Sequence, residues 1–436
     1  MVKKVDTAVV HLWGKTVGAV SWLEQRGYAV FEYDPPFFNH DWDISPIHMG
    51  LEQARQGKRL FSFPALNKDT YLGLPGLLAD ALPDKFGNHI IDAWLARQGR
   101  PAQGFSPVER LCYTGKRAMG ALEFSPAVIA KHDKSVAVDI GDLVQLAQHI
   151  MQQRHSLDVE LGTSDQSNND ALLDILRVGT SAGGARPKAV IAINSQGHVL
   201  SGQAKAPPDY DYWILKFDGV TDLELGEPKG YGRIEYAYHL MALAAGISMS
   251  PCRLLEENGR AHFMTKRFDR ERGKKRHMQS LCGMAHYDFN QAGAYSYEQA
   301  FGIMRQLRLS KADALQLYRR MVFNVLARNL DDHSKNIGFL MNPDGEWSLS
   351  PAYDITYAHN PAGQWTSRHQ MSIQGKRDNF SKADLVAVGK SISLSKPEQI
   401  VDEILDAVAQ WPEFARQAEV KPQWIENIQS HLLLKL

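Results

Sequence analysis

The first 40 residues contain short apolar runs of the kind that form β-strands. Residues 7–13 form an apolar run rich in β-branched side chains, residues 18–22 resume the run after a glycine turn, and residues 32–36 end a third run at two prolines. Because successive side chains of a strand point to opposite faces, these runs predict a small β domain. Its aromatic residues are expected to pack in the core rather than to stack on bases; they are Trp13, Trp22, Tyr28, Phe31 and Tyr33.

The middle of the chain mixes the helical period with further strands. Apolar residues three or four positions apart favour helices, whereas short runs of β-branched and aromatic residues favour strands. Asn258-Gly259 lies between two such runs and is typical of the type I′ turn of a β-hairpin. The predicted helices are 73–94, 140–154 and 233–245, and the predicted strands are 189–193, 212–217, 253–255 and 261–264.

The last third of the chain has a mainly helical pattern. An apolar stripe at helical spacing recurs in five segments that are separated by polar stretches. A β-rich half followed by a helical half predicts an α+β protein with two lobes. The predicted helices are 297–307, 311–328, 382–388, 397–409 and 424–434.

Composition narrows the function classes. The chain has 436 residues, with 49 Lys and Arg against 49 Asp and Glu. Zero net charge excludes a protein that coats nucleic acid through its overall charge. The locally basic run 270–277 is predicted to be a solvated loop rather than a surface for DNA phosphates or an acidic protein. Three widely spaced cysteines and the lack of a long apolar stretch predict a cytoplasmic protein with no membrane segment.

The segment 329–336 carries the most informative polar residues. Phosphoryl transfer needs a carboxylate beside the attacking hydroxyl, and a carboxylate with an amide oxygen to hold magnesium. Kinase catalytic loops space the base and the amide as Asp-x-x-x-x-Asn, which is the spacing of Asp331 and Asn336. Asp354, after a short apolar run, lies where the second metal ligand of a kinase lies. Asp332 is the alternative base, and the competing interpretation is an ordinary polar surface loop.

A second segment, residues 179–188, is rich in small residues and leads into a predicted strand. Small residues allow backbone N–H groups to approach phosphate oxygens. The order GxxxxGK[ST] and the following helix of a Walker A motif are missing. The segment therefore indicates either an ordinary glycine-rich connection or a kinase-like loop over the phosphates.

Lys216 lies in the otherwise apolar strand 213–217. Burying a lysine there is costly unless it is paired. In a kinase this lysine contacts the α- and β-phosphates and pairs with a helix glutamate, for which Glu235 is the candidate. An outward-facing strand lysine is the alternative. The strand that leaves the predicted hairpin, at 265–270, is placed to offer backbone groups to an adenine edge.

These segments follow one another in the order found in kinases, and in this combination the chain resembles the HipA family. That family consists of serine/threonine kinase toxins of bacterial toxin–antitoxin modules. The resemblance covers nearly the whole chain, and its most specific part is 331–336 with 353–355. The residues that carry it are 181–188, 214–216, 266–270, 331–336 and 353–355, with 73–84 and 110–116 in the N-terminal part.

The resemblance implies a bilobal, protein-kinase-like α+β fold. Its parts would be an N-terminal β-rich subdomain at 1–130, a part similar to a kinase N-lobe at 131–270, and a helical catalytic lobe at 271–436. The implied cofactors are ATP and Mg²⁺. Ser181 matches the family's regulatory autophosphorylation serine, with Thr180 as the neighbouring competitor.

The resemblance also implies a role for individual residues. Asp331 would be the catalytic base, Asn336 and Asp354 would hold magnesium, and Lys216, paired with Glu235, would contact the phosphates. Arg186-Pro187 departs from the Gln-Glu of some members, and its proline removes one backbone N–H from the loop. The nucleotide would further meet Gly183, Gly184, Ala185, Arg186, Lys188, the backbone of Lys266, Arg267 and Phe268, and the side chains of His333, Lys335 and Tyr353.

The partners implied by the resemblance are a small helix-turn-helix antitoxin similar to HipB, operator DNA bound through that antitoxin, and a protein substrate such as an aminoacyl-tRNA synthetase. Two other function classes stay open. One is a small-molecule kinase on the same fold, and the other is a non-catalytic DNA-binding corepressor. The intact Asp331, Asn336, Asp354 and Lys216 argue against the corepressor.

Overall fold

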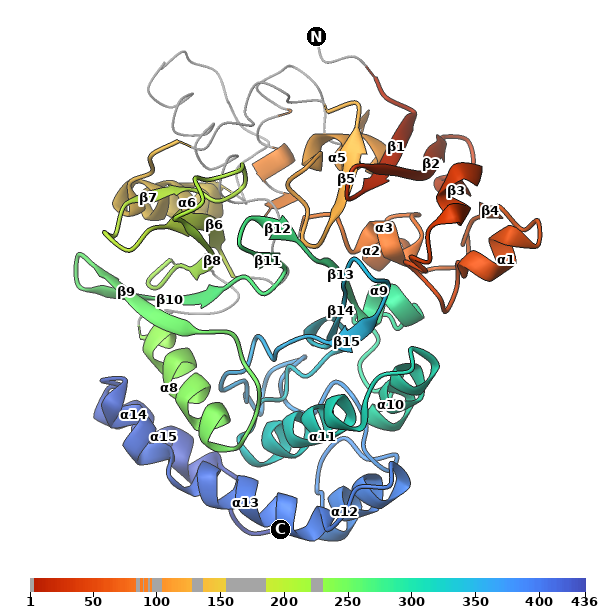
Figure 1. Cartoon of the computed structure of the whole chain (residues 1–436). Coiled ribbons are helices and arrows are strands. Elements are labelled where there is room, and N and C mark those ends of the chain that lie inside the picture. Colours follow the sequence, from red (N-terminus) through yellow and green to blue (C-terminus); the bar gives the residue numbers. More distant parts are fainter. Residues whose placement is uncertain are drawn as a thin grey trace. The chain divides into compact units, whose positions relative to one another are not determined.

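The computed structural model describes residues 4–83, 87–88, 90–92, 95, 104–127, 136–153, 186–220 and 230–436 (Figure 1). The chain forms two compact units. Unit 1 comprises residues 1–44, 49–232 and 253–278, and unit 2 comprises residues 45–48, 233–252 and 279–436. Both parts predicted for residues 1–270 belong to unit 1, apart from 45–48 and 233–252. The three-part division itself stays a prediction.

The N-terminal part of unit 1 is a five-stranded antiparallel sheet, which includes the strands predicted for the first 40 residues. Ala8, Val10 and Leu12 are fully buried, whereas the residues between them are partly exposed. Phe31 and Tyr33 are buried in the core, which confirms the packing role predicted for them. In the order β4-β3-β2-β1-β5 the strands are Leu60–Phe61, Tyr28–Tyr33, Lys15–Leu23, Thr7–Leu12 and Leu122–Ser125.

Short helices accompany this sheet, and one of them differs from its prediction. The helix expected over 73–94 is interrupted, because α3 has only four residues and a turn leads from it to Pro83, which has no backbone N–H. Helix α5, which the sequence analysis did not predict, begins with a capping box between Ser106 and Glu109. The helices are η1 (Pro35–Asn39), α1 (Leu51–Arg55), α2 (Lys68–Tyr71), α3 (Gly76–Ala79) and α5 (Pro107–Thr114).

A second five-stranded sheet, in the order β7-β6-β8-β10-β9, follows in unit 1. Ala189, Ile191, Trp213 and Leu215 lie on one of its faces and share a core with helix α6. Asn258 and Gly259 have positive φ angles of 46° and 74°, so the predicted type I′ turn is confirmed. The bounds are α6 (Ile140–Gln153), β6 (Lys188–Ile193), β7 (Val199–Ser201), β8 (Asp211–Lys216), β9 (Cys252–Glu257) and β10 (Arg260–Lys266).

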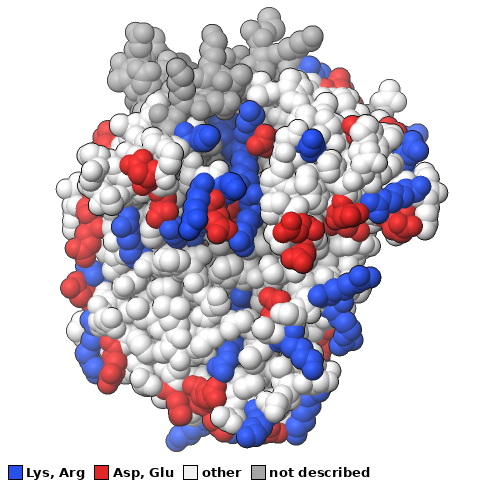
Figure 2. Space-filling model, in the orientation of Figure 1, with Lys and Arg blue, Asp and Glu red and all other residues white. Residues whose placement is uncertain are grey.

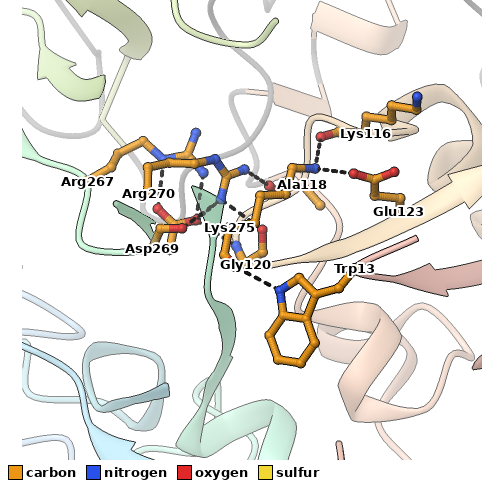
Figure 3. Close-up of polar contacts among 9 residues, drawn as sticks. All are labelled: Trp13, Lys116, Ala118, Gly120, Glu123, Arg267, Asp269, Arg270 and Lys275. Carbon is orange, nitrogen blue, oxygen red and sulfur yellow. Dashed lines mark hydrogen bonds and ion pairs between the residues drawn. The ribbon is translucent and has the colours of Figure 1, made fainter. Parts of the chain in front are cut away.

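The basic run 270–277 is only in part the solvated loop that was predicted, because residues 271–274 are exposed whereas Arg270, Lys275 and Arg276 are partly buried and His277 is buried. It forms the hairpin β11 (Arg270–Glu271) and β12 (Lys274–Lys275), whose turn has φ angles of 47° and 76° at Arg272 and Gly273. Arg270 pairs with the fully buried Asp269 at 2.8 Å, and Lys275 pairs with Glu123 at 2.8 Å (Figure 3). Figure 2 shows Lys and Arg side chains gathered over this hairpin with acidic side chains beside them.

Unit 2 is mainly helical, and serine caps explain why three of its helix starts, at residues 297, 311 and 382, were predicted correctly. Ser296, Ser310 and Ser381 each begin a helix with a capping box. Arg328, with φ of 57°, follows helix α11 in the left-handed conformation. The helices are α8 (Tyr231–Ala244), α9 (Leu281–Ala285), α10 (Tyr297–Gln306), α11 (Lys311–Leu326), η4 (Ser334–Asn336), α12 (Lys382–Ser391), α13 (Pro397–Ala409), α14 (Trp411–Gln417) and α15 (Pro422–His431).

A small sheet in the order β13-β14-β15 completes the fold; its strands are His277–Ser280, Gly338–Met341 and Trp347–Leu349. The loop between α11 and β14 holds Asp331 and Asn336, and the loop after β15 holds Asp354. Among the described residues, no helix is long and apolar enough to cross a membrane.

Candidate active site

The loop between α11 and β14 is fixed at its start by main-chain hydrogen bonds. Leu330 N–H donates to the carbonyl of Ala358 at 3.0 Å, and Ala358 N–H donates to the carbonyl of Arg328 at 3.1 Å. The loop therefore leaves the helix in a defined direction. Its next residue, Asp331, has a side chain that is 48% exposed.

Asp331 and Asn336 lie together, as their spacing predicts. The side-chain amide of Asn336 donates to the main-chain carbonyl of Asp331 at 2.8 Å. This bond leaves the Oδ1 of Asn336 as an acceptor for a cation. His333 Nε2 lies 3.7 Å from Asp331 Oδ1, so the imidazole lies beside the candidate base.

Asp354 shares a pocket with Asn336 and His333. Its φ angle of 52° is a left-handed conformation, which non-glycine residues adopt mainly where surrounding structure imposes it. Tyr353 fixes the adjacent position, because its hydroxyl donates to the carbonyl of Lys335 at 2.6 Å. The pocket encloses about 20 Å³, which is room for one water molecule.

The donor set of this pocket suits magnesium. An Asp carboxylate and an amide oxygen are hard oxygen ligands, and Mg²⁺ is usually held by one or two such groups together with water and substrate phosphates. Within the described ranges, no group of three or more His, Cys, Asp or Glu side chains could hold a metal ion by itself. If Asn336 and Asp354 held such a cation, water and substrate phosphates would have to supply its other ligands.

Asp332, the alternative base, lies in a different environment from Asp331. Its side chain is only 1% exposed. Three donors reach its carboxylate, which are the Tyr297 hydroxyl at 3.0 Å, His369 Nδ1 at 2.8 Å and the Gln370 N–H at 2.8 Å. Of the two carboxylates, Asp331 is the one that an entering hydroxyl can reach.

His333 and Lys335 are held by a shared aromatic neighbour. Lys335 Nζ lies 4.7 Å from the centre of the Phe289 ring, and the His333 ring lies 5.4 Å from the same ring. The Phe289 ring therefore lies close to both side chains, and the contacts predicted for them with the nucleotide phosphates stay a prediction.

The sequence analysis missed a set of buried polar residues under this loop. Arg320 is 4% exposed and donates to the carbonyl of Ser350 at 2.5 Å, and burial lowers the pKa of its guanidinium to about 10. Its Nε and Nη1 have no hydrogen-bond partner among the described residues. Arg320 and Asn324 are four positions apart on the buried side of α11. Polar residues at that spacing in an apolar stripe were the available signal.

The predicted phosphate-contacting residues of unit 1 lie on one sheet face. Lys188 and Lys216 are directly opposite each other on neighbouring antiparallel strands. Lys188 is buried, and Lys216 Nζ lies 5.7 Å from the centre of the Phe263 ring. Arg186 lies over the Tyr231 ring at 4.2 Å.

The structure gives the positions of several other predicted residues but does not test the contacts that were predicted for them. Glu235 is buried in α8 of unit 2, whereas Lys216 belongs to unit 1, so their pairing stays a prediction. Lys266 pairs with Asp211 at 2.8 Å, and Arg267 donates its main-chain N–H to Tyr212 at 2.8 Å. The adenine contacts of Lys266, Arg267 and Phe268 likewise stay predictions. Thr180, Ser181, Gly183, Gly184 and Ala185 lie outside the described residues.

Comparison with known proteins gives matches along most of the chain. The HipA N-terminal domain matches residues 8–125, and the HipA-like C-terminal domain matches residues 180–412. Y4mE of Sinorhizobium fredii, named as a candidate kinase, is 25% identical over 170 residues, which cover 36% of this chain and 36% of that protein. The match thus spans about a third of that relative's length.

A solved structure shares the fold. HipA of Shewanella oneidensis MR-1, determined in a complex with HipB and operator DNA, matches with a TM-score of 0.66 and 15% sequence identity. The match covers 98% of this chain and 96% of that one. It confirms the predicted α+β, kinase-like fold with two lobes. Since the C-terminal domain match alone covers more than half of the sequence, the chain belongs to the HipA family.

Proposed function

We propose that this protein is an ATP- and Mg²⁺-dependent kinase that transfers the γ-phosphoryl group to a serine or threonine hydroxyl. The observation that carries the proposal is the arrangement of Asp331, Asn336 and Asp354. The Asn336 side-chain amide donates to the main-chain carbonyl of Asp331, whose carboxylate is half-exposed, and Asn336 lines a pocket with the Asp354 carboxylate. A carboxylate base beside two hard oxygen ligands is the set that phosphoryl transfer requires.

In this proposal each residue has a separate task. Asp331 accepts the proton of the attacking hydroxyl. The imidazole of His333 lies 3.7 Å from the Asp331 carboxylate. Asn336 Oδ1 and the Asp354 carboxylate hold Mg²⁺, which would neutralise charge on the phosphate oxygens when bound. Lys188 and Lys216, which lie opposite each other on one sheet face, bind phosphate oxygens.

The same proposal extends to regulation and partners. Autophosphorylation at Ser181 would add about −1.5 to −2 charges to the glycine-rich loop and repel the nucleotide phosphates. The solved HipA of Shewanella oneidensis is bound to HipB and operator DNA. By analogy, we propose a small helix-turn-helix antitoxin and its operator as partners, and a translation factor such as an aminoacyl-tRNA synthetase as the phosphorylated protein.

Labelled ATP tests the proposal directly. The protein is incubated with [γ-³²P]ATP, Mg²⁺ and a dephosphorylated bacterial lysate, beside the variants Asp331→Asn and Asp344→Asn. Asp344 lies exposed in the turn between β14 and β15, so its variant is a matched control for loss of a loop carboxylate. We expect Asp331→Asn to lower labelling of protein by about 10²- to 10⁴-fold and the control to label normally.

The other function classes give distinct results in the same experiment. A label that appears only in small molecules would indicate a small-molecule kinase. Unchanged labelling by Asp331→Asn would contradict its role as the base. Complete absence of transfer by the wild-type protein, together with tight DNA binding, would favour the corepressor.

A further inference from the structure

One buried carboxylate, that of Asp332, joins the loop of the candidate base to two other parts of unit 2. Its Oδ2 accepts hydrogen bonds from the Tyr297 hydroxyl at 3.0 Å and from His369 Nδ1 at 2.8 Å. Its Oδ1 accepts from the main-chain N–H of Gln370 at 2.8 Å. Tyr297 begins α10, whereas His369 and Gln370 belong to the segment that follows Asp354. The donors thus come from two separate stretches of sequence, Tyr297 from one and the adjacent His369 and Gln370 from the other.

The network continues and returns to the same loop. Asn324 on α11 donates to the Tyr297 hydroxyl at 3.1 Å, and Asn329 donates to Asn324 Oδ1 at 2.9 Å. Asn329 precedes Asp331 by two residues, and Asp332 follows it directly. The candidate base is therefore held on both sides by one chain of buried hydrogen bonds. These hydrogen bonds restrict the conformations that the loop can adopt on both sides of Asp331.

The segment around His369 is itself braced. His369 N–H donates to the carbonyl of Arg377 at 3.1 Å, and Arg377 Nε donates to the carbonyl of His369 at 2.6 Å. Gly293 N–H donates to the carbonyl of Gln370 at 2.8 Å. The His369 ring is 1% exposed and packs against Phe380 at 5.3 Å. Asp332 thus binds to a rigid part of the segment.

The chemistry requires a carboxylate at this position. Three donors reach two oxygens, and only a carboxylate accepts on both. An asparagine at position 332 could be oriented in two ways. Its NH₂ group would face either the main-chain N–H of Gln370, which is only a donor and cannot accept a hydrogen bond, or the side chains of Tyr297 and His369. In the second case His369 would have to carry its proton on Nε2, which is buried and has no hydrogen-bond partner within the described part of the chain. A buried donor without a partner is costly.

We propose that Asp332 is a positioning residue for phosphoryl transfer, which holds Asp331 in the orientation that meets the acceptor hydroxyl. This inference rests on the proposed kinase function. A purely structural role would predict that loss of the network lowers stability and nucleotide binding along with turnover. A positioning role predicts a different result, because the residues proposed to bind MgATP are left in place while the geometry of the base is lost.

The experiment compares four variants with the wild-type protein. Asp332→Asn removes the carboxylate, His369→Phe removes one donor, and Tyr297→Phe removes another while it keeps the ring. Asp378→Asn is the matched control, because it breaks the exposed 3.1 Å ion pair with Arg368 in the same segment. For each protein we measure the Kd for MgATP, kcat for ADP release and for transfer to protein at saturating ATP, and the unfolding temperature.

The assays are run well below the unfolding temperature of each variant. Under these conditions we expect Asp332→Asn to lower kcat by about 10- to 100-fold and to change the Kd for MgATP by no more than about threefold. His369→Phe should lower kcat less, Tyr297→Phe least, and Asp378→Asn not at all. If Asp332→Asn does not fold, the positioning role is judged from the order of the kcat values of the other three variants. Equal losses in binding and turnover, or unchanged kcat, would overturn the positioning role. A wild-type protein without phosphoryl transfer would instead refute the proposed function.

Discussion

The side-chain amide of Asn336 donates its hydrogen bond to the main-chain carbonyl of Asp331, five residues earlier, at 2.8 Å. This bond sets the amide orientation and directs its Oδ1 away from the carbonyl. A single contact thereby links the candidate base to the candidate metal ligand. The pair is also the part of the site in which a spacing in the sequence and a contact in space agree most directly.

Asn336→Ala should weaken the Mg²⁺ dependence of turnover. The change removes both the loop hydrogen bond and the amide oxygen, so the Mg²⁺ concentration for half-maximal activity should rise by at least about tenfold. Turnover is measured across a Mg²⁺ titration at fixed ATP. Asn427→Ala, on the exposed side of α15, is the control and should follow the wild-type curve. An unchanged Mg²⁺ midpoint in Asn336→Ala would exclude the metal role.

Lys216→Met should separate phosphate recognition from adenine recognition. The variant keeps the length of the side chain and removes its charge. Loss of a charged contact to phosphate should raise the Kd for ATP by about 10- to 100-fold and leave the Kd for adenosine unchanged. Equal weakening of ATP and adenosine binding would indicate general damage to unit 1 instead.

Local patterns predicted most of the elements and the centre of the site. Asp331 and Asn336 could be paired from the sequence because both lie in one short loop, whose geometry depends on near neighbours. Helix starts were predictable for the same reason, since a capping serine acts within one turn. The fold class followed from the order of strand and helix periods.

Long-range pairing was not predictable from one sequence. The basic run 270–277 was predicted to be solvated because a local window shows its charge and not the distant acid. Asp269 accepts a hydrogen bond from the N–H of Gly120, 149 residues away, and Lys275 pairs with Glu123. Asp332 gave no sign of its role for the same reason, since its partners Tyr297 and His369 lie more than thirty residues from it on either side.

His277→Gln should reduce the pH dependence of stability in mildly acidic solution. Burial lowers the pKa of His277 from its ordinary value of about 6.5 to about 4. The unfolded chain therefore binds the extra proton first, and the free energy of unfolding should fall as pH drops from about 6.5 to about 4, by up to about 1.4 kcal/mol per pH unit. Urea unfolding at several pH values measures this slope. An identical slope in wild type and variant would show that His277 does not contribute.

Asp269→Asn should destabilise unit 1 near neutral pH, and the loss of unfolding free energy should be smaller in acid. Burial alone would raise the pKa of Asp269, but Arg267, Arg270 and the N–H of Gly120 outweigh it and hold the pKa well below its ordinary value (Figure 3). The carboxylate therefore stabilises the fold above the unfolded pKa of about 4, and that contribution is lost as pH falls through the lower pKa of the folded state. Removing one partner of a buried ion pair typically costs about 3–5 kcal/mol. We expect urea unfolding to show a loss of unfolding free energy of that size at neutral pH and a smaller loss below about pH 4.

Glu271→Gln, which breaks only the exposed 2.6 Å pair with Arg276, should change the unfolding free energy by less than about 1 kcal/mol. If both variants lost the same small amount, the buried cluster would have no special part in joining β5 and the β11–β12 hairpin.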